Sequence, residues 1–184
     1  NLLSESLYLT GLLGDPMEFF NQRWLKKFRE KHDTQYSDFP SFLAFLKSRR
    51  TSPNGVFGYN LKVDQFKNII PKNFNGMQWA PSLLQQTEKF VFLRRRDRLD
   101  QAISAYIGKQ RDTFRIPIEA DVKEIHKIVE DVPFRPVVLS NQISNSMEQD
   151  KIWENFLANS GKPVFEIYYE DMVADFEGSI RAVA

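Results

Sequence analysis

The sequence contains no cysteine. This absence excludes disulfide frameworks, thiolate nucleophiles and cysteine-ligated metals, and it fits a reducing compartment, so we expect a cytoplasmic protein. Histidine is almost as scarce. The two imidazoles, His32 and His126, each have a charged neighbour in the sequence. We interpret both as solvated surface side chains and expect no bound metal.

Long apolar runs are also missing. No stretch approaches the roughly 18 apolar residues that a membrane span needs, and the first residues lack the basic segment of a signal peptide. An excess of one charge is missing as well, because 25 basic and 24 acidic residues leave a net charge of +1. We therefore expect no nucleic-acid partner and no anionic membrane surface, and any anion site must be local.

The length and hydrophobic content are sufficient for one sizeable core. With 184 residues, of which 42% are hydrophobic, we expect a single domain spanning 1–184. The chain starts inside a helical pattern without an initiator methionine and stops on another helical pattern. We interpret it as a fragment that is cut at both ends.

Hydrophobic periodicity predicts helices separated by three short apolar strands. The expected helices begin near residues 2, 19, 38, 98, 121, 143 and 176. Ser37-Asp38 marks the start of the third of these helices, and Asp175 caps the last one. The expected strands cover residues 56–63, 89–93 and 163–168. Strands with apolar interiors between helices favour an α/β fold in which a parallel sheet carries helices on both faces. Ligands of such sheets bind beyond the carboxyl ends of the strands.

One strand end carries an unusual density of charge. The segment Arg94-Arg95-Arg96-Asp97-Arg98 follows the strand at 89–93 and opens a helix. Guanidinium groups and free backbone N–H groups would converge there on an anion, and Ser104 on the helix could add a hydroxyl. A solvated rim, in which the arginines pair with Asp97 and Asp100, is the alternative.

This strand, turn and helix resemble a segment of a known enzyme family. The run from Phe92 to Tyr106, with its Asp-x-x-x-Gln-Ala-x-Ser pattern, is similar to the 3′-phosphate-binding segment of bacterial sulfotransferases of the trehalose 2-sulfotransferase and lipopolysaccharide-sulfotransferase type. The resemblance implies a P-loop, nucleotide-kinase-like sulfotransferase fold and 3′-phosphoadenosine 5′-phosphosulfate (PAPS) as the sulfonate donor. It places the phosphate on Arg95 and Ser104, with Arg96 as the fallback.

Three further stretches resemble the same family in the same order: residues 2–20, 53–65 and 153–171. The match of Pro16-Met17-Glu18-Phe19-Phe20 implies that Glu18 is the general base, because an attacking hydroxyl must lose a proton. The alternative is that Glu18 caps a helix starting near Phe19. The resemblance also makes Asp15 a candidate ligand of the acceptor hydroxyl. The stretch 21–50 matches poorly.

Two features depart from the family pattern. Asn60 stands where relatives commonly carry a lysine, and Lys62 follows two residues later. The family's 5′-phosphosulfate loop would lie before Asn1, so only the backbone N–H groups of Asn1, Leu2 and Leu3 remain from that part of the donor site.

The resemblance implies a sulfotransferase that moves a sulfonate group from PAPS to a hydroxyl of a carbohydrate or glycolipid, without a metal. It also suggests a homodimer. Tyr106 and Gln110, after the arginine turn, are candidates for lining the acceptor cleft, although a core or rim role fits each of them equally well. Two alternatives stay open: a P-loop kinase, and a degenerate domain that binds a nucleotide or a partner protein without catalysis.

Overall fold

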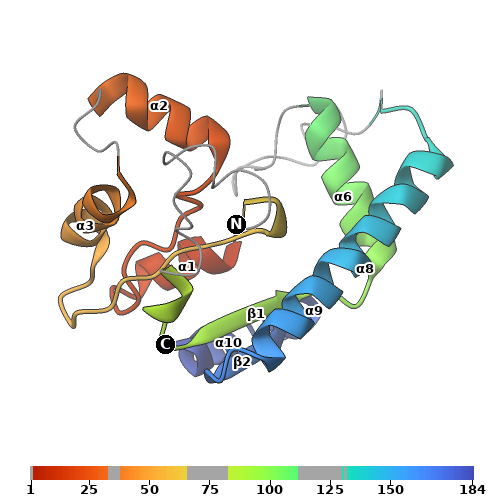
Figure 1. Cartoon of the computed structure of the whole chain (residues 1–184). Helices are drawn as coiled ribbons and strands as arrows, with labels where there is room; N and C mark the ends of the chain where they lie inside the picture. The colour runs from red at the N-terminus through yellow and green to blue at the C-terminus, as the bar shows by residue number, and fades with distance from the viewer. Residues whose placement is uncertain (1, 33–37, 66–82, 112–129, 131) are drawn as a thin grey trace. The chain divides into compact units, whose positions relative to one another are not determined.

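The computed structural model describes residues 2–32, 38–65, 83–111, 130 and 132–184 (Figure 1). Its helices and strands follow one another in this order: α1 (Leu2–Leu9), α2 (Gln22–His32), α3 (Phe39–Arg50), β1 (Phe90–Arg94), α6 (Arg98–Arg111), α8 (Pro136–Ala158), β2 (Val164–Tyr168), α9 (Tyr169–Ala174) and α10 (Phe176–Val183). Within these residues, no helix is both long and apolar enough to cross a membrane. His126, the side chain of His32 and most of the helix expected at 121–131 lie outside the described residues.

The described chain packs as two compact units. The first contains residues 1–92, 161–167 and 171–184, and the second contains residues 93–160 and 168–170. We describe each unit separately. The expectation of one domain over the whole chain stays a prediction.

An aromatic core holds α2 and α3 together in the first unit. Phe28 of α2 meets Phe42 of α3 edge to face at 5.2 Å, and Phe20, just before α2, meets the same ring at 6.2 Å. All three rings are buried. Edge-to-face pairs stabilise beyond the area that they bury. The segment that matched the family pattern least therefore supplies much of this core.

The predicted cap at Asp175 is confirmed, and Asp38 caps the helix that was expected to start at Ser37-Asp38. The backbone N–H of Ser41 donates to Asp38 Oδ1 at 2.9 Å, and that of Gly178 donates to Asp175 Oδ1 at 3.0 Å. Each carboxylate satisfies an N–H group that has no partner inside the helix. The hydrogen bonds from the backbone and hydroxyl of Ser41 hold the pKa of Asp38 below its ordinary value.

Two of the three predicted strands form. β1 and β2 are hydrogen-bonded neighbours in a small parallel sheet. The expected strand at 56–63 is wrong. Its backbone instead makes a single antiparallel bridge between Thr51 and Phe57, and Asn60 N–H donates to Met17 O at 2.9 Å. The segment therefore pairs its backbone groups with Thr51 after α3 and with Met17 before α2 rather than with a strand.

Packing of α6 against α8 forms the core of the second unit (Figure 1). Ala102 and Tyr106 of α6 and Leu139 of α8 are its buried residues. α8 starts at Pro136, seven residues before the predicted start, because proline is well suited to the first turn of a helix. Four aromatic residues near the end of the chain lie outside this core: Trp153, Phe156 and Tyr168 are only partly buried, and Phe165 is 40% exposed on β2.

Candidate functional site

The arginine turn, residues 94–98, connects β1 to α6 as predicted. Asp97 closes the turn, because its Oδ1 accepts the backbone N–H of Asp100 at 2.9 Å in the manner of a helix cap. The cap fixes where the helix begins. It also shows that Asp97 neutralises the helix N-terminus rather than an arginine.

Two of the four arginines are held by acidic residues of α8. Arg94 lies 2.6 Å from Glu154 Oε1 and 3.4 Å from Asp150 Oδ2, and Arg98 pairs with the same Asp150 carboxylate. Arg98 also donates to Gln101 Oε1 at 3.1 Å. These partly buried pairs join the turn to α8, so Arg94 and Arg98 have a structural role.

The other two arginines lie on tyrosine rings. The guanidinium carbon of Arg95 is 3.8 Å from the ring centre of Tyr169, and that of Arg96 is 4.1 Å from the ring centre of Tyr168. Stacking orients a guanidinium while leaving its N–H edge able to bind an anion. Arg95 is half-buried and makes no ion pair with any carboxylate in the described part of the chain. Within the described residues, its guanidinium is thus oriented by a ring and makes no ion pair.

The expectation of free backbone N–H groups at this turn is wrong for two residues. Both carboxylate oxygens of Glu170 accept the N–H of Arg96 at 3.1 Å, and Oε1 also accepts the N–H of Asp97 at 3.1 Å. Burial acts to raise the pKa of Glu170, but the hydrogen bonds from Arg96, Asp97 and its own N–H, together with the charge of Arg95, lower it overall. An anion at this turn therefore depends on side chains.

The lowered pKa of Glu170 predicts a pH-dependent contribution to stability. A carboxylate with a lowered folded-state pKa stabilises the fold above its ordinary value of 4.5 and loses this contribution as pH falls through the folded-state pKa. We expect Glu170→Gln to lower the thermal midpoint by about 1–2 °C at pH 7, a small effect because the group is exposed. The gap between wild type and variant should close between pH 5 and 3. A gap that is the same at both ends of this range would contradict the assignment.

The remaining candidates of the second unit lie on α6. Ser104 and Gln110 are exposed on the helix, where a ligand could reach them. Tyr106 is only 4% exposed, and its hydroxyl donates to Pro133 O at 2.8 Å. Of the two roles that the sequence left open for Tyr106, this geometry matches the core position.

The predicted base, Glu18, has two polar neighbours in the first unit. Lys62 Nζ lies 2.9 Å from Glu18 Oε1, and Gln65 Nε2 donates to Glu18 Oε2 at 3.2 Å. The alternative role as a helix cap belongs to Asn21 instead, whose Oδ1 accepts the N–H of Arg23 at 2.9 Å. Glu18 is 26% exposed, so its carboxylate is reachable from solvent.

The N-terminal helix contacts Asn60, the residue at which relatives commonly carry a lysine. Asn60 Nδ2 donates to Ser4 Oγ of α1 at 3.1 Å. Leu2 opens α1 and is exposed, whereas Asn1 lies outside the described residues. Residue 60 thus contacts the first helix with an amide, and the lysine next to Glu18 comes from position 62.

Asp15, the candidate acceptor ligand, forms an ion pair with Arg50 at the end of α3. Its backbone N–H donates to Arg50 O at 3.1 Å. The backbone before Asp15 can approach the end of α3 this closely because Gly14 has no side chain. A Cβ at residue 14 would lie 2.5 Å from Arg50 O and 2.9 Å from Val56 O, and the φ of Gly14 is 69°. Only glycine fits this approach.

We therefore expect Gly14→Ala to destabilise the protein by about 2–4 kcal/mol, since backbone strain and a clash with two carbonyls add up. Gly11→Ala is the matched control, because Gly11 has the same φ of 69° with no atom within 4 Å of its added Cβ. The control should lose only about 1 kcal/mol. Urea unfolding of both variants measures the difference, and equal losses would show that the close approach is unimportant.

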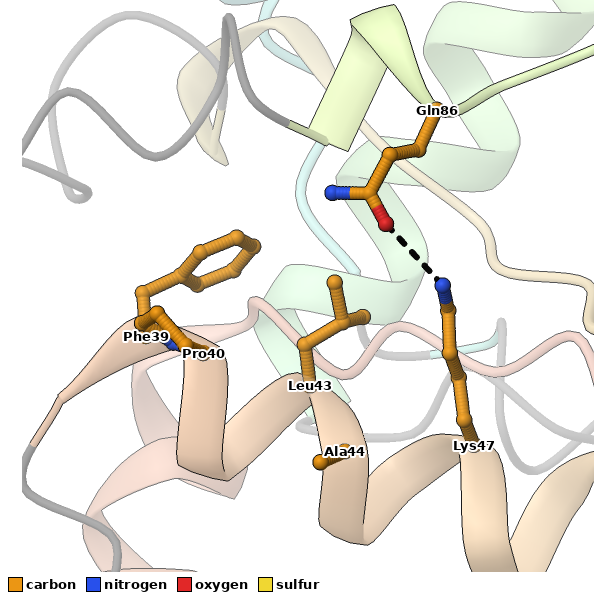
Figure 2. Close-up of a pocket in the computed structure, with 6 residues that line it drawn as sticks. All are labelled: Phe39, Pro40, Leu43, Ala44, Lys47 and Gln86. Atoms are coloured by element: carbon orange, nitrogen blue, oxygen red, sulfur yellow. Dashed lines mark hydrogen bonds between the residues drawn. The ribbon is translucent and has the colours of Figure 1, made fainter.

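A hollow of about 250 Å³ lies elsewhere in the first unit (Figure 2). Figure 2 shows apolar side chains of α3 and the hydrogen bond from Lys47 Nζ to Gln86 Oε1, which is 3.0 Å long. None of the predicted site residues lines this hollow. We therefore assign it no role in the site.

The described residues define a mixed α/β protein with a cationic turn at the end of a strand. The family model of Stf0 sulphotransferases matches residues 1–183. Because the match covers almost the whole chain, the protein belongs to the Stf0 sulphotransferase family. A comparison with curated proteins gives no match. The predicted sulfotransferase family is thus confirmed, while the trehalose or lipopolysaccharide type stays a prediction.

Proposed function

We propose that the protein transfers a sulfonate group from PAPS to a hydroxyl of a carbohydrate or glycolipid. Family membership supports the class of reaction. The observation that carries the donor assignment is Arg95, a half-buried guanidinium that is stacked on Tyr169 and has no ion pair in the described part of the chain. A phosphate dianion is the kind of ligand that such an oriented guanidinium, without an ion pair among the described residues, binds.

The proposed reaction is a single in-line displacement. The acceptor oxygen attacks sulfur, its new S–O bond forms as the bond from sulfur to the 5′-phosphate oxygen breaks, and the hydroxyl proton passes to Glu18. The products are a sulfate ester and adenosine 3′,5′-bisphosphate. By analogy with phosphoryl transfer, the rest of catalysis is positioning and charge stabilisation.

Each predicted residue has a role in this proposal. Arg95 and Ser104 hold the 3′-phosphate, with Arg96 beside them, and the N-terminus of α1 at Asn1 and Leu2 faces the sulfate. Glu18 is the base. Asp15 and Gln110 are candidates for contacting the acceptor, whereas the buried Tyr106 shapes the cleft only through packing. The P-loop fold, the homodimer and the cytoplasmic location that the sequence suggested belong to the same proposal.

A transfer assay with the full-length protein tests the proposal. The protein is incubated with PAPS carrying ³⁵S and a panel of acceptors that includes trehalose and glycolipids, and label in each acceptor is measured. We expect label from PAPS on at least one hydroxylated acceptor. In a parallel incubation with ATP in place of PAPS, we expect no transfer of the γ-phosphate. Phosphate transfer from ATP would support the kinase alternative. Binding of adenosine 3′,5′-bisphosphate without any sulfonate transfer would support the degenerate domain.

A further inference from the structure

Both oxygens of the Glu18 carboxylate are held by side chains from one short segment. The ammonium of Lys62 lies 2.9 Å from Oε1, and the amide of Gln65 donates to Oε2 at 3.2 Å. A carboxylate that is held at both oxygens has its plane fixed. Each oxygen still keeps a second lone pair, which can receive a proton.

Gln65 is the rigid contact of this pair. The residue is 1% exposed. Both polar atoms of its amide make hydrogen bonds, because Nε2 donates to Glu18 and Oε1 accepts the backbone N–H of Lys62 at 3.2 Å. A buried amide is stable only when its hydrogen bonds are made, so this side chain has little freedom to move. Gln65 therefore connects Glu18 to the backbone of the same segment that carries Lys62.

Lys62 is the exposed contact. Its side chain is 55% exposed, compared with 26% for Glu18. Position 60 supplies no cation here, because it is an asparagine whose amide donates to Ser4 Oγ at 3.1 Å. The positive charge next to the Glu18 carboxylate thus comes from Lys62, two residues after position 60.

We propose that Gln65 and Lys62 are positioning residues, which hold the Glu18 carboxylate in the orientation in which it receives the proton of the acceptor hydroxyl. Gln65 supplies the fixed contact and Lys62 supplies the charged one. This inference rests on the proposed function, in which Glu18 is the base. It adds two residues that act through Glu18 and leave donor binding unaffected.

Substitution of the two residues tests the inference through the separation of kcat from KM. We expect Gln65→Leu, which keeps the size and removes both hydrogen bonds, to lower kcat by about 10- to 100-fold, since a misoriented base loses much of its catalytic contribution. Lys62→Met should lower kcat by about 10-fold, and Lys62→Arg should restore it to within about 3-fold because the positive charge is kept. The KM for PAPS should stay within about 2-fold in all three variants.

Lys47→Met is the matched control. Lys47 also contacts a glutamine side chain in the first unit, at 3.0 Å from Gln86 Oε1 (Figure 2). Among the described residues, its side chain contacts neither Glu18 nor any other residue of the proposed site. We expect this variant to keep the kcat of the parent. A similar loss in Lys47→Met and Lys62→Met would overturn the specific role of Lys62.

A double-mutant cycle separates positioning from general stability. In the Glu18→Gln background, Gln65→Leu should cause no further loss beyond about 2-fold, because the residue acts through a carboxylate that is already absent. A purely structural role predicts the same factor in both backgrounds. Thermal unfolding and calorimetry with adenosine 3′,5′-bisphosphate verify the fold of each variant. If Gln65→Leu does not fold, the comparison of kcat between Lys62→Met and Lys62→Arg decides whether the positioning role holds.

The outcomes distinguish this inference from the proposed function. If the parent transfers no sulfonate, or if Glu18→Gln stays active, the proposed function of Glu18 fails and this inference fails with it. If the parent is active and Glu18→Gln is inactive, but Lys62→Met and every folded Gln65 variant keep the parental kcat, only the positioning role is overturned.

Discussion

Replacing Glu18 with glutamine is expected to lower kcat by about 10³-fold in the full-length protein, because general-base catalysis contributes about 10²- to 10⁴-fold. Glutamine has nearly the same shape, yet it cannot take up the proton that the acceptor hydroxyl must lose. The affinity for adenosine 3′,5′-bisphosphate should stay within about 2-fold, since the proposed donor contacts lie on other residues. Initial rates at saturating donor and acceptor, together with calorimetry of the bisphosphate, measure both quantities.

Glu30→Gln is a suitable control for this substitution. Glu30 is an exposed residue of α2 whose carboxylate lies 3.9 Å from Lys26 Nζ. Glu30→Gln therefore removes one negative charge, as Glu18→Gln does, without affecting the predicted base. The control should keep the parental kcat. Equal activity of the Glu18 and Glu30 variants would remove Glu18 from the mechanism.

Replacing Arg95 with alanine should weaken binding of adenosine 3′,5′-bisphosphate by about 10- to 100-fold, because a hydrogen bond to a charged group contributes about 1.5–3 kcal/mol. Arg95→Lys should recover only part of the affinity, since lysine lacks the planar fork and stacks less well on Tyr169. Calorimetry on the wild type and the two variants gives the three dissociation constants.

Arg181→Ala serves as the control for charge. Arg181 is 78% exposed and pairs with Glu177 one turn away in α10, so its loss should leave the affinity unchanged. If Arg95→Ala binds as the wild type does while Arg96→Ala loses affinity, the phosphate contact belongs to the fallback residue. If neither variant loses affinity, the arginine turn does not bind the nucleotide.

Local sequence patterns were sufficient to predict the elements that frame the site. The apolar run that ends in arginines became β1 and the arginine turn, and the periodic residues after it became α6. The caps at Asp38 and Asp175 were predictable because capping depends on residues only three positions apart. The failed strand at 56–63 shows the limit, since its alternating pattern says nothing about which backbone it will pair with.

Contacts between distant residues of the chain could not be predicted. Glu170 reaches the N–H of Arg96 from 74 positions away, and Gln65 reaches Glu18 from 47 positions away. In the sequence, Glu170 was only one residue of the stretch 153–171 that resembles the family. The sequence gave no reason to prefer Arg95 over the other arginines except the resemblance. The structure separates them because α8 brings Asp150 and Glu154 to Arg94 and leaves Arg95 on a tyrosine ring.

The central claim is that the arginine turn binds the 3′-phosphate of an adenosine nucleotide. Calorimetry of the full-length wild type with adenosine 3′,5′-bisphosphate and with adenosine 5′-monophosphate tests it most directly, because the two ligands differ only in that phosphate. We predict that the bisphosphate binds at least about 10-fold more tightly, as expected for a charge-assisted contact. Equal affinities for the two nucleotides would contradict the claim.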